Sequence, residues 1–527
     1  MMSMTLKLFN TLTKQKEEFK TVIHGIVRMY NCGPTVYMTP HIGNYRAYLF
    51  ADILKRYLKY KKYDVHQVQN ITDVGHMTAD QDMAHGGEDK LEKTARKEGK
   101  TPWQIAEYYA SIFMKEIEIL NIDKAIEYPR ATEHINEMIQ IIEELIRKGH
   151  AYIANGSVYY DVTSFPNYGA MTGNTVEKLL EGAGGRVDHN PDKKNHFDFA
   201  LWVNDLSHIM GWKSPWCEKG YPGWHIECTA MSFRHLTQAF ESEKESKRGG
   251  EKESKRGSEK ESKKKSEKSG IKFVPEKFET IDIHTGGEDN VFPHHECEIA
   301  QSEGATNKKF CNFWMHTRHL LVDGKKMSKS KGNFYVLKDI LNKGYSARMF
   351  RLAIISVNYR IPLNFTFEGM DAARKNIQKI DEFMEKIEEI NNFKPETIVI
   401  EQAIDLLIRN AKKEFEEAMN DDLNISGAMA VMYFLMTEIN KLISNNQVNR
   451  ENAAKIHSLM MNFDKVLGVI EKTKIKIPQN IIELAQQRLK ARKEKNWAVS
   501  DALRKKAHEL GYQIDDIEEG YKVKKLH

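Results

Sequence analysis

The sequence is poor in cysteine, with five in 527 residues. An odd and sparse set in so long a chain argues against a disulfide framework, so we expect reduced thiols that are available to bind metal. No apolar run approaches the ~20 residues that a membrane span requires, and the first 20 residues lack the apolar segment of a secretory signal. These absences predict a cytoplasmic protein without membrane contact. The cysteines are Cys32, Cys217, Cys228, Cys297 and Cys311.

Net charge is also low, at +5. Much of it comes from residues 241–270, where eleven Lys or Arg stand against eight Glu, so the overall charge gives no indication of nucleic-acid binding. Variants of Glu-Lys-Glu-Ser-Lys-Arg-Gly recur there every eight residues, without an apolar residue. Such a segment cannot bury surface, which predicts a disordered surface insertion. A weak RNA- or partner-binding segment is the alternative.

A chain of 527 residues is too long for one hydrophobic core, so we expect three or four domains. A strand-like segment over 26–32, a helical apolar pattern over 44–60 and a second strand over 64–72 form a βαβ unit, which predicts a doubly wound parallel sheet. A generic α/β domain without a nucleotide remains open at this point. Strand-like sequence returns at 278–284 and 314–322, and helices follow from about 366. We expect one helix over 420–442 and another over 480–510, with Asn480 as its N-cap.

Two segments have the composition of phosphate-binding loops. Pro40-His41-Ile42-Gly43-Asn44 lies between the first strand and its helix, where free N–H groups and the helix dipole attract phosphate oxygens. Far downstream, glycines flank Lys326-Met327-Ser328-Lys329-Ser330, which predicts a mobile loop whose lysines and serines neutralise pyrophosphate. Each segment alone is also compatible with an ordinary turn. The interpretation as phosphate-binding loops depends on the presence of both segments in one chain.

Thiols, imidazoles and carboxylates recur in three further segments. Cys32 precedes the first loop, Cys228 ends the run from Pro222, and the third segment holds His294 and Glu298, four residues apart on one helical face. Two thiolates, one imidazole and one carboxylate form a plausible zinc set. Spacing alone leaves other donors eligible, namely His225, His295 and Cys297.

The paired loops resemble the signatures of class I aminoacyl-tRNA synthetases. In that family the first motif binds ATP at the start of a Rossmann fold, and the second closes over the phosphates. The usual fourth residue of the first motif is His, and here it is Asn44, which still donates a hydrogen bond. The resemblance implies catalytic roles for His41, Asn44, Lys326 and Lys329. It implies ATP contacts from Pro40, His41, Gly43, Asn44, Lys326, Ser328, Lys329 and Ser330.

Three motifs narrow the resemblance to the cysteinyl-tRNA synthetase family, over nearly the whole chain except 241–270. They are Tyr30-Asn31-Cys32-Gly33-Pro34-Thr35-Val36-Tyr37, the run from Pro222 to Cys228, and His284-Thr285-Gly286-Gly287-Glu288-Asp289 with the run from Phe292 to Glu298. The resemblance implies one zinc ion on Cys32, Cys228, His294 and Glu298. It also places the substrate near Gly33, Thr35, Thr72 and Trp224.

The implied architecture is a catalytic Rossmann domain over 1–330, which contains an acceptor-binding insertion at about 120–220 and the segment 241–270. A stem-contact linker over 331–365, a helical bundle over 366–475 and an anticodon-binding domain over 476–527 follow. The bundle carries the signature-like run Asn420-Asp421-Asp422-Leu423-Asn424. In the last domain an exposed Trp stacks on an unstacked base, and Arg and Asp read base edges. The implied anticodon residues are Arg492, Trp497, Asp501 and Asp516; a buried, structural Trp497 is the alternative.

These features predict a monomeric enzyme that uses ATP with Mg²⁺ to join L-cysteine to tRNA(Cys). Zinc suits this reaction because an apolar pocket separates cysteine from serine by only ~1–3 kcal/mol, whereas zinc prefers a thiolate. We therefore expect the substrate sulfur to join the zinc ligands, and no editing domain. The rivals are a ligase that joins cysteine to an amino sugar, which lacks the C-terminal tRNA domain, and an inactive tRNA-binding protein, which the intact motifs argue against.

Overall fold

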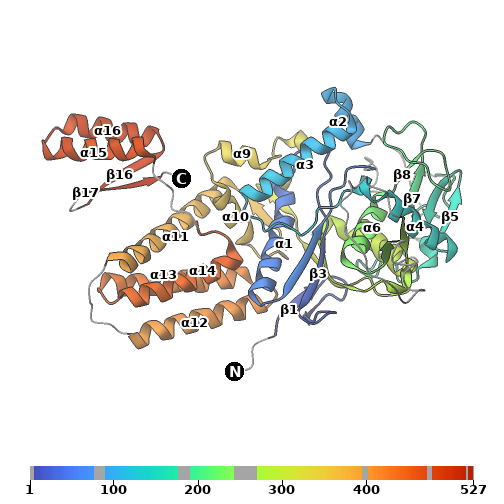
Figure 1. The fold of residues 1–527 in the computed structure, drawn as a ribbon, viewed down its shortest axis with the longest axis horizontal. Coiled ribbons are helices and arrows are strands. Elements are labelled where there is room, and N and C mark those ends of the chain that lie inside the picture. Colours follow the sequence, from blue (N-terminus) through green and yellow to red (C-terminus); the bar gives the residue numbers. More distant parts are fainter. Residues whose placement is uncertain are drawn as a thin grey trace, which may run out of the picture.

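A computed structural model describes residues 5–75, 89–175, 178, 190–242, 270–393, 401–471, 478–517 and 520–525. Figure 1 shows an elongated molecule, with the α/β part at one end and helices toward the other. The predicted disordered insertion 241–270 lies outside the described residues, apart from its two ends.

The centre of the α/β part is a four-stranded parallel sheet in the order β12-β11-β3-β4. Residues alternate between its faces: Val27 and Met29 join a core with the first helix and the C-terminal bundle, whereas Tyr30 joins the core on the opposite face. Helices thus cover both faces, and the predicted doubly wound fold is confirmed. The elements are β3 (Ile26–Asn31), α1 (Ile42–Tyr60), β4 (Asp64–Gln69), β11 (Ile281–Gly287), α8 (Glu296–Thr306) and β12 (Cys311–Thr317).

The strand order reverses between β3 and β11. The chain passes from β3 through α1 to β4 on one side, and later returns to the other side of β3 as β11. In open parallel sheets, ligands bind in the crevice at the carboxyl ends of the strands where the order reverses. The topology therefore places the expected site between the loops that follow β3 and β11.

A long insertion separates β4 from β11. It holds a four-stranded antiparallel sheet, in the order β5-β6-β7-β8, within the range predicted for the acceptor-binding insertion. This sheet and helix α6 share the hydrophobic core on the Tyr30 face of the central sheet. The elements are α2 (Lys90–Glu98), α3 (Pro102–Ile119), α4 (Ile135–Arg147), β5 (Ala151–Ala154), β6 (Ser157–Tyr160), β7 (Phe199–Asn204), β8 (Gly220–Pro222), α6 (Trp224–Leu236), β9 (Phe240–Ser242) and β10 (Ile271–Phe273).

Shorter elements frame the central sheet. A hairpin of β1 (Lys7–Asn10) and β2 (Gln15–Glu18) precedes it. After the last strand of the central sheet in the chain, β13 (Leu320–Val322) pairs with β14 (Lys325–Lys326) and β15 (Leu363–Phe365). Helices α9 (Leu337–Asn342) and α10 (Ala347–Ile355) lie between β14 and β15 in sequence, so the range 331–365 that was predicted to be a linker contains two helices.

The remaining helices are amphipathic. In α14, Ile456, Met460 and Phe463 are buried at helical spacing and share the core of α1. No helix in the described part of the chain combines the length and hydrophobicity that crossing a membrane requires. The elements are α11 (Phe367–Phe393), α12 (Glu401–Asn420), α13 (Ile425–Ser444), α14 (Arg450–Leu467), α15 (Gln479–Lys493), α16 (Trp497–Glu509), β16 (Tyr512–Ile517) and β17 (Gly520–Lys525).

Two helix predictions need correction. The predicted helix 420–442 begins later, because Asp422 and Leu423 have positive φ and the Asn424 side chain caps α13 by accepting from Gly427 N–H. The predicted helix 480–510 is two helices, α15 and α16, separated at Lys495, whose φ is +57°. Asn480 is not the N-cap, since α15 begins one residue before it, after Pro478.

Candidate active site and metal centre

The first phosphate-type motif forms the N-terminus of α1. His41 is the N-cap, and its Nδ1 accepts from Gly43 N–H at 3.1 Å. Asn44 closes the capping box by accepting from His41 N–H at 2.9 Å. The first turn of α1 has no acidic residue. The positive end of the helix dipole is therefore available to an anion.

The second motif lies directly against the first, although about 280 residues separate them in the sequence. Ile42 N–H donates to Tyr335 O at 2.9 Å, and Lys329 Nζ lies 3.7 Å from Met38 Sδ. A Cβ at Gly43 would lie 2.8 Å from Met327 Cε, so glycine permits this approach. Burial lowers the pKa of His41, and the nearby Lys329 acts in the same direction, against Asp289. The remaining motif residues, Pro40, Lys326, Ser328 and Ser330, flank these contacts in the chain.

The side chains of the four predicted zinc ligands come together near the carboxyl ends of β3 and β11. Cys32 follows β3, Cys228 lies in the first turns of α6, and His294 and Glu298 lie in the turn after β11 and at the start of α8. One donor atom from each lies within 4.8 Å of those of the other three. His294 Nε2 is 3.0 Å from Glu298 Oε1. Two thiols, one imidazole and one carboxylate in this arrangement fit a zinc ion.

Strong mutual electrostatic effects mark the cluster. A hydrogen bond with Cys32 lowers the pKa of Cys228 to about 6. Burial acts against ionisation of Glu298, yet His284 and His294 hold its pKa at about 2. Burial likewise opposes the charged form of His294, but Glu298 and Cys228 raise its pKa to about 10. Buried groups of opposite charge thus stabilise one another, as expected where a cation is to be bound.

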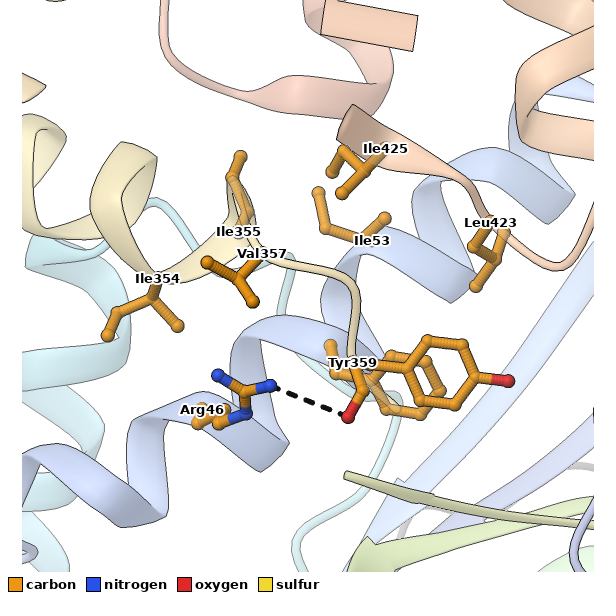
Figure 2. A pocket seen from close by; sticks show the side chains of 9 residues that line it. Arg46, Ile53, Ile354, Ile355, Val357, Tyr359, Leu423 and Ile425 are labelled. Atoms are coloured by element: carbon orange, nitrogen blue, oxygen red, sulfur yellow. Dashed lines mark hydrogen bonds between the residues drawn. The ribbon is translucent and has the colours of Figure 1, made fainter. Parts of the chain in front are cut away.

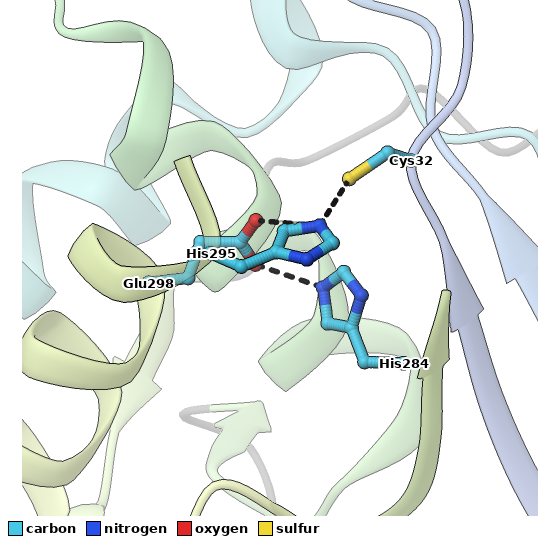
Figure 3. A group of neighbouring side chains, drawn as sticks. All are labelled: Cys32, His284, His295 and Glu298. Atoms are coloured by element: carbon cyan, nitrogen blue, oxygen red, sulfur yellow. Dashed lines mark hydrogen bonds and ion pairs between the residues drawn. The ribbon is translucent and has the colours of Figure 1, made fainter. Parts of the chain in front are cut away.

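More histidines surround the cluster than the sequence indicated. His284 Nε2 lies 2.9 Å from Glu298 Oε2, and His295 Nε2 lies 3.1 Å from Cys32 Sγ (Figure 3). Cys32, His284, His295 and Glu298 form a second group of neighbouring donors. His295 Nδ1 in turn lies 2.6 Å from His316 Nε2. Spacing gave no reason to include His284 or His316, since both enter from strands β11 and β12 through tertiary packing.

Two of the other eligible donors, His225 and Cys297, lie outside both donor groups. His225 Nδ1 lies 2.9 Å from His294 Nδ1, which leaves His294 Nε2 facing the carboxylate of Glu298. His225 therefore orients a donor from outside the two groups. Cys297 points elsewhere, with its Sγ 3.4 Å from the hydroxyl of Tyr168.

The predicted substrate residues lie on segments next to the donor cluster and on the loops that follow β3 and β4. The Trp224 ring stacks on His294, with centroids 4.3 Å apart and 25° between the planes. Thr35 pairs with Thr72 in an isolated parallel bridge, which joins the loops that follow β3 and β4. Gly33 N–H donates to Asn70 Oδ1 at 2.7 Å, and a Cβ at Gly33 would overlap Asn70 O. Close packing against Asn70 is therefore a structural reason for glycine at position 33, separate from any contact with the substrate.

The predicted anticodon residues lie together at the C-terminal end. Trp497 opens α16 and is 56% exposed, which is inconsistent with a core role. The Arg492 guanidinium lies 5.5 Å from the Trp497 ring centroid, and Arg492 Nη1 is 2.8 Å from Asp516 Oδ2. The sequence did not single out Arg488, which binds Asp516 and lowers the pKa of that carboxyl. Asp501 is exposed on α16.

Comparison with protein families gives two matches. Residues 18–247 and 272–375, more than half of the chain, match the profile described as tRNA synthetases class I (C) catalytic domain. Residues 414–471 match the DALR domain. Both matches fall on the elements described above: the Rossmann-type sheet with its insertion, and helices α12 to α14.

Curated relatives match this sequence over nearly its full length. Proteins named cysteine–tRNA ligase from Protochlamydia amoebophila and Caldicellulosiruptor saccharolyticus are 38% and 36% identical, with 99% of this chain and 98% and 100% of theirs covered. Among solved structures, a Mycobacterium tuberculosis methionyl-tRNA synthetase in complex with methionyl-adenylate has a TM-score of 0.55. It is 12% identical, with 84% of this chain and 90% of that one covered, so the likeness concerns the fold.

Replacing one thiol tests the metal centre. Cys228→Ser should weaken zinc binding by more than about a hundredfold, which exceeds the cost of losing an outer hydrogen-bond partner. The measurement is zinc affinity by competition with a chelator. Cys217→Ser is the matched control, because Cys217 lies outside both donor groups. Equal zinc affinity in the two variants would contradict the ligand assignment.

Proposed function

Because the chain belongs to the cysteine–tRNA ligase family of class I aminoacyl-tRNA synthetases, we propose that it joins L-cysteine to tRNA(Cys) in two steps, with zinc recognising the substrate thiol. In the first step a carboxylate oxygen of cysteine attacks the α-phosphorus of ATP. The bond to the β-phosphate breaks, and pyrophosphate leaves with Mg²⁺. In the second step a hydroxyl of the 3′-terminal adenosine of the tRNA takes the cysteinyl group, and AMP leaves.

One observation carries this proposal: a four-donor cluster lies where the strand order reverses, beside a helix N-terminus and a lysine loop. Its donor atoms lie within 4.8 Å of one another. The two phosphate-type motifs meet each other through Ile42, whose N–H donates to Tyr335 O, at the start of the helix that follows Cys32 in the chain. A thiol-reading centre and an ATP-binding end thus share one crevice, which is the arrangement that formation of a cysteinyl-adenylate requires.

The donor set explains a preference for cysteine over serine. A zinc ion on Cys32, Cys228, His294 and Glu298 would supply a further coordination position that favours a thiolate over a hydroxyl. Trp224 stacks on His294 and would hold that imidazole in place beside the substrate. With Gly33, Thr35 and Thr72 it would complete the amino-acid pocket. Recognition at this first step removes the need for an editing domain.

The phosphate half of the reaction needs positioning and charge stabilisation rather than a side-chain nucleophile. We assign binding of the phosphates to His41 and Asn44 at the N-terminus of α1, with Pro40 and Gly43 shaping that loop. Lys326 and Lys329, with Ser328 and Ser330, would hold the pyrophosphate that leaves. Lys329 is the lysine that approaches the first motif, since its Nζ lies 3.7 Å from Met38 Sδ and affects His41 electrostatically.

The C-terminal part would select the tRNA. We assign residues 366–475 to a bundle that spans the distance to the anticodon and residues 476–527 to anticodon binding. Trp497 offers an exposed ring backed by Arg492, a suitable platform for an unstacked base. The pairing of Asp516 with Arg488 and Arg492 fixes this platform against the β16–β17 hairpin.

Cobalt substitution tests the thiol-reading role. Addition of cysteine to the cobalt-loaded protein should change its visible absorption spectrum, because sulfur would join the metal ligands. Serine should leave the spectrum unchanged. If cysteine also left it unchanged while cysteine remained preferred over serine in activation, the proposed role of the metal would be wrong.

Lys329→Ala tests the phosphate assignment. Cysteine-dependent ATP–pyrophosphate exchange should fall well over tenfold, in line with loss of one donor to transition-state charge. The spectral response of the cobalt centre to cysteine should persist. Lys338→Ala, at an exposed lysine on nearby α9, is the control and should exchange normally. Wild-type exchange in Lys329→Ala would count against the assignment.

Trp497→Ala tests the tRNA platform. Loss of one base–ring stack should weaken tRNA(Cys) binding by about 1–3 kcal/mol. Pyrophosphate exchange, which needs no tRNA, should stay at the wild-type rate. Leu510→Ala removes a comparably exposed apolar side chain just beyond α16 and should leave tRNA affinity unchanged. A loss of affinity in both variants alike would assign the effect to stability of this domain.

A further inference from the structure

A small cavity lies away from the active site, where three parts of the molecule meet. Its volume is about 30 Å³. Helix α1 contributes Phe50 and Ile53, the end of α10 and the following loop contribute Ile354 and Val357, and the start of α13 contributes Ile425 (Figure 2). The cavity therefore lies at the junction between the central sheet's first helix and the C-terminal bundle.

One charged side chain lines this apolar space. Arg46, from α1, is 3% exposed, and its guanidinium lies among the lining side chains (Figure 2). Its Nη2 donates to the carbonyls of Asn358 at 3.2 Å, Tyr359 at 3.5 Å and Ile361. Its Nε and Nη1 are buried and have no hydrogen-bond partner in the residues that the structure describes. Two of the three guanidinium nitrogens thus have donors to spare.

The charge of Arg46 is also unbalanced. Within the described ranges, Arg46 forms no ion pair, in contrast to the other buried arginine of this junction, Arg351, whose Nη2 lies 2.5 Å from Asp52 Oδ2. Burial lowers the pKa of Arg46 to about 10, so the side chain stays charged at neutral pH. The carboxylate that counteracts this effect is Glu288, which already bonds Arg318 at 2.9 Å. A buried, unpaired charge costs several kcal/mol unless a counter-charge accompanies it.

We propose that this cavity is a binding site for a small monovalent anion, of the size of chloride or formate, with Arg46 as its counter-charge. The size fits, since one water-sized group needs about 10–15 Å³ of such space. The single positive charge and the apolar lining favour a monovalent anion over phosphate, whose second charge would remain uncompensated in an apolar site. A water molecule would accept hydrogen bonds from the unpartnered guanidinium nitrogens of Arg46, but it would leave the positive charge of that side chain without a counter-charge.

An anion bound to Arg46 would lie between helix α1, which begins at the proposed ATP-binding loop, and the helical bundle of the proposed tRNA-binding part. Arg46 lies in the second turn of α1, after the His41 cap, and its carbonyl partners belong to the loop after α10. Ile425, on the opposite wall, opens α13 of the bundle. Neutralising Arg46 there would stabilise the contact between α1 and the bundle, without touching the metal centre or the phosphate motifs.

Crystals of the full chain grown in sodium bromide test the site directly. Anomalous diffraction at the bromine edge should show a peak in the cavity, in contact with the Arg46 guanidinium. In solution, replacing gluconate with chloride or with formate at constant ionic strength should raise the thermal unfolding midpoint by a few degrees, as binding to the folded state alone requires. Only ordered water at Arg46 in the bromide crystals would overturn the proposal.

Two variants separate anion binding from a structural role of Arg46. Arg46→Met removes the counter-charge, and Val357→Phe fills the cavity from a half-buried position while Arg46 remains. Both should lose the bromide peak and the chloride-dependent shift. Lys62→Met, an exposed charge just after α1, should keep both. A chloride-dependent shift that persists in Val357→Phe would also overturn the proposal, even if Arg46→Met fails to fold.

Discussion

Parallel pairing of β3 with β11 is the constraint on which the site depends. Because both strands run in the same direction, their carboxyl ends reach the same edge of the sheet, and the strand order reverses between them. Cys32 leaves one strand at that edge, and the turn that carries His294 leaves the other. α1 also starts after the carboxyl end of β3, so its N-terminus and the donor cluster lie at the same edge of the sheet.

Burial then sets the chemistry of the centre. The donor atoms of Cys32, Cys228, His294 and Glu298 are buried together, where like charges would repel and unpaired charges would be costly. The opposite shifts of the pKa values of His294 and Glu298 show how far each group depends on its neighbour. A cation satisfies this set because it lets both thiols ionise together.

The arginines of the molecule show two ways of treating buried charge. Arg351 pairs with Asp52, which also pairs with Arg56, and bonds carbonyls at the ends of α3 and α14, so it links the α/β part to the bundle through a direct carboxylate contact. Arg46 bonds carbonyls in the same region without a carboxylate partner among the described residues. At the C-terminal end, Asp516 binds two arginines and leaves Trp497 exposed. Arg351 and Arg488 thus have a carboxylate in direct contact, whereas the described residues supply none to Arg46.

The sequence alone determined the βαβ unit, the two phosphate-type motifs and the four donors, because each depends on local periodicity or on a short motif resembling a known family. It did not locate the helix breaks near 421–424 and 494–496, where left-handed residues interrupt an unbroken apolar pattern. It also left His225, His295 and Cys297 eligible as ligands. Tertiary structure places His225 and Cys297 outside both donor groups, keeps His295 within the second group, and adds His284 and His316 beside them. Convergence of side chains from different strands is fixed by sheet order and packing, which no local pattern encodes.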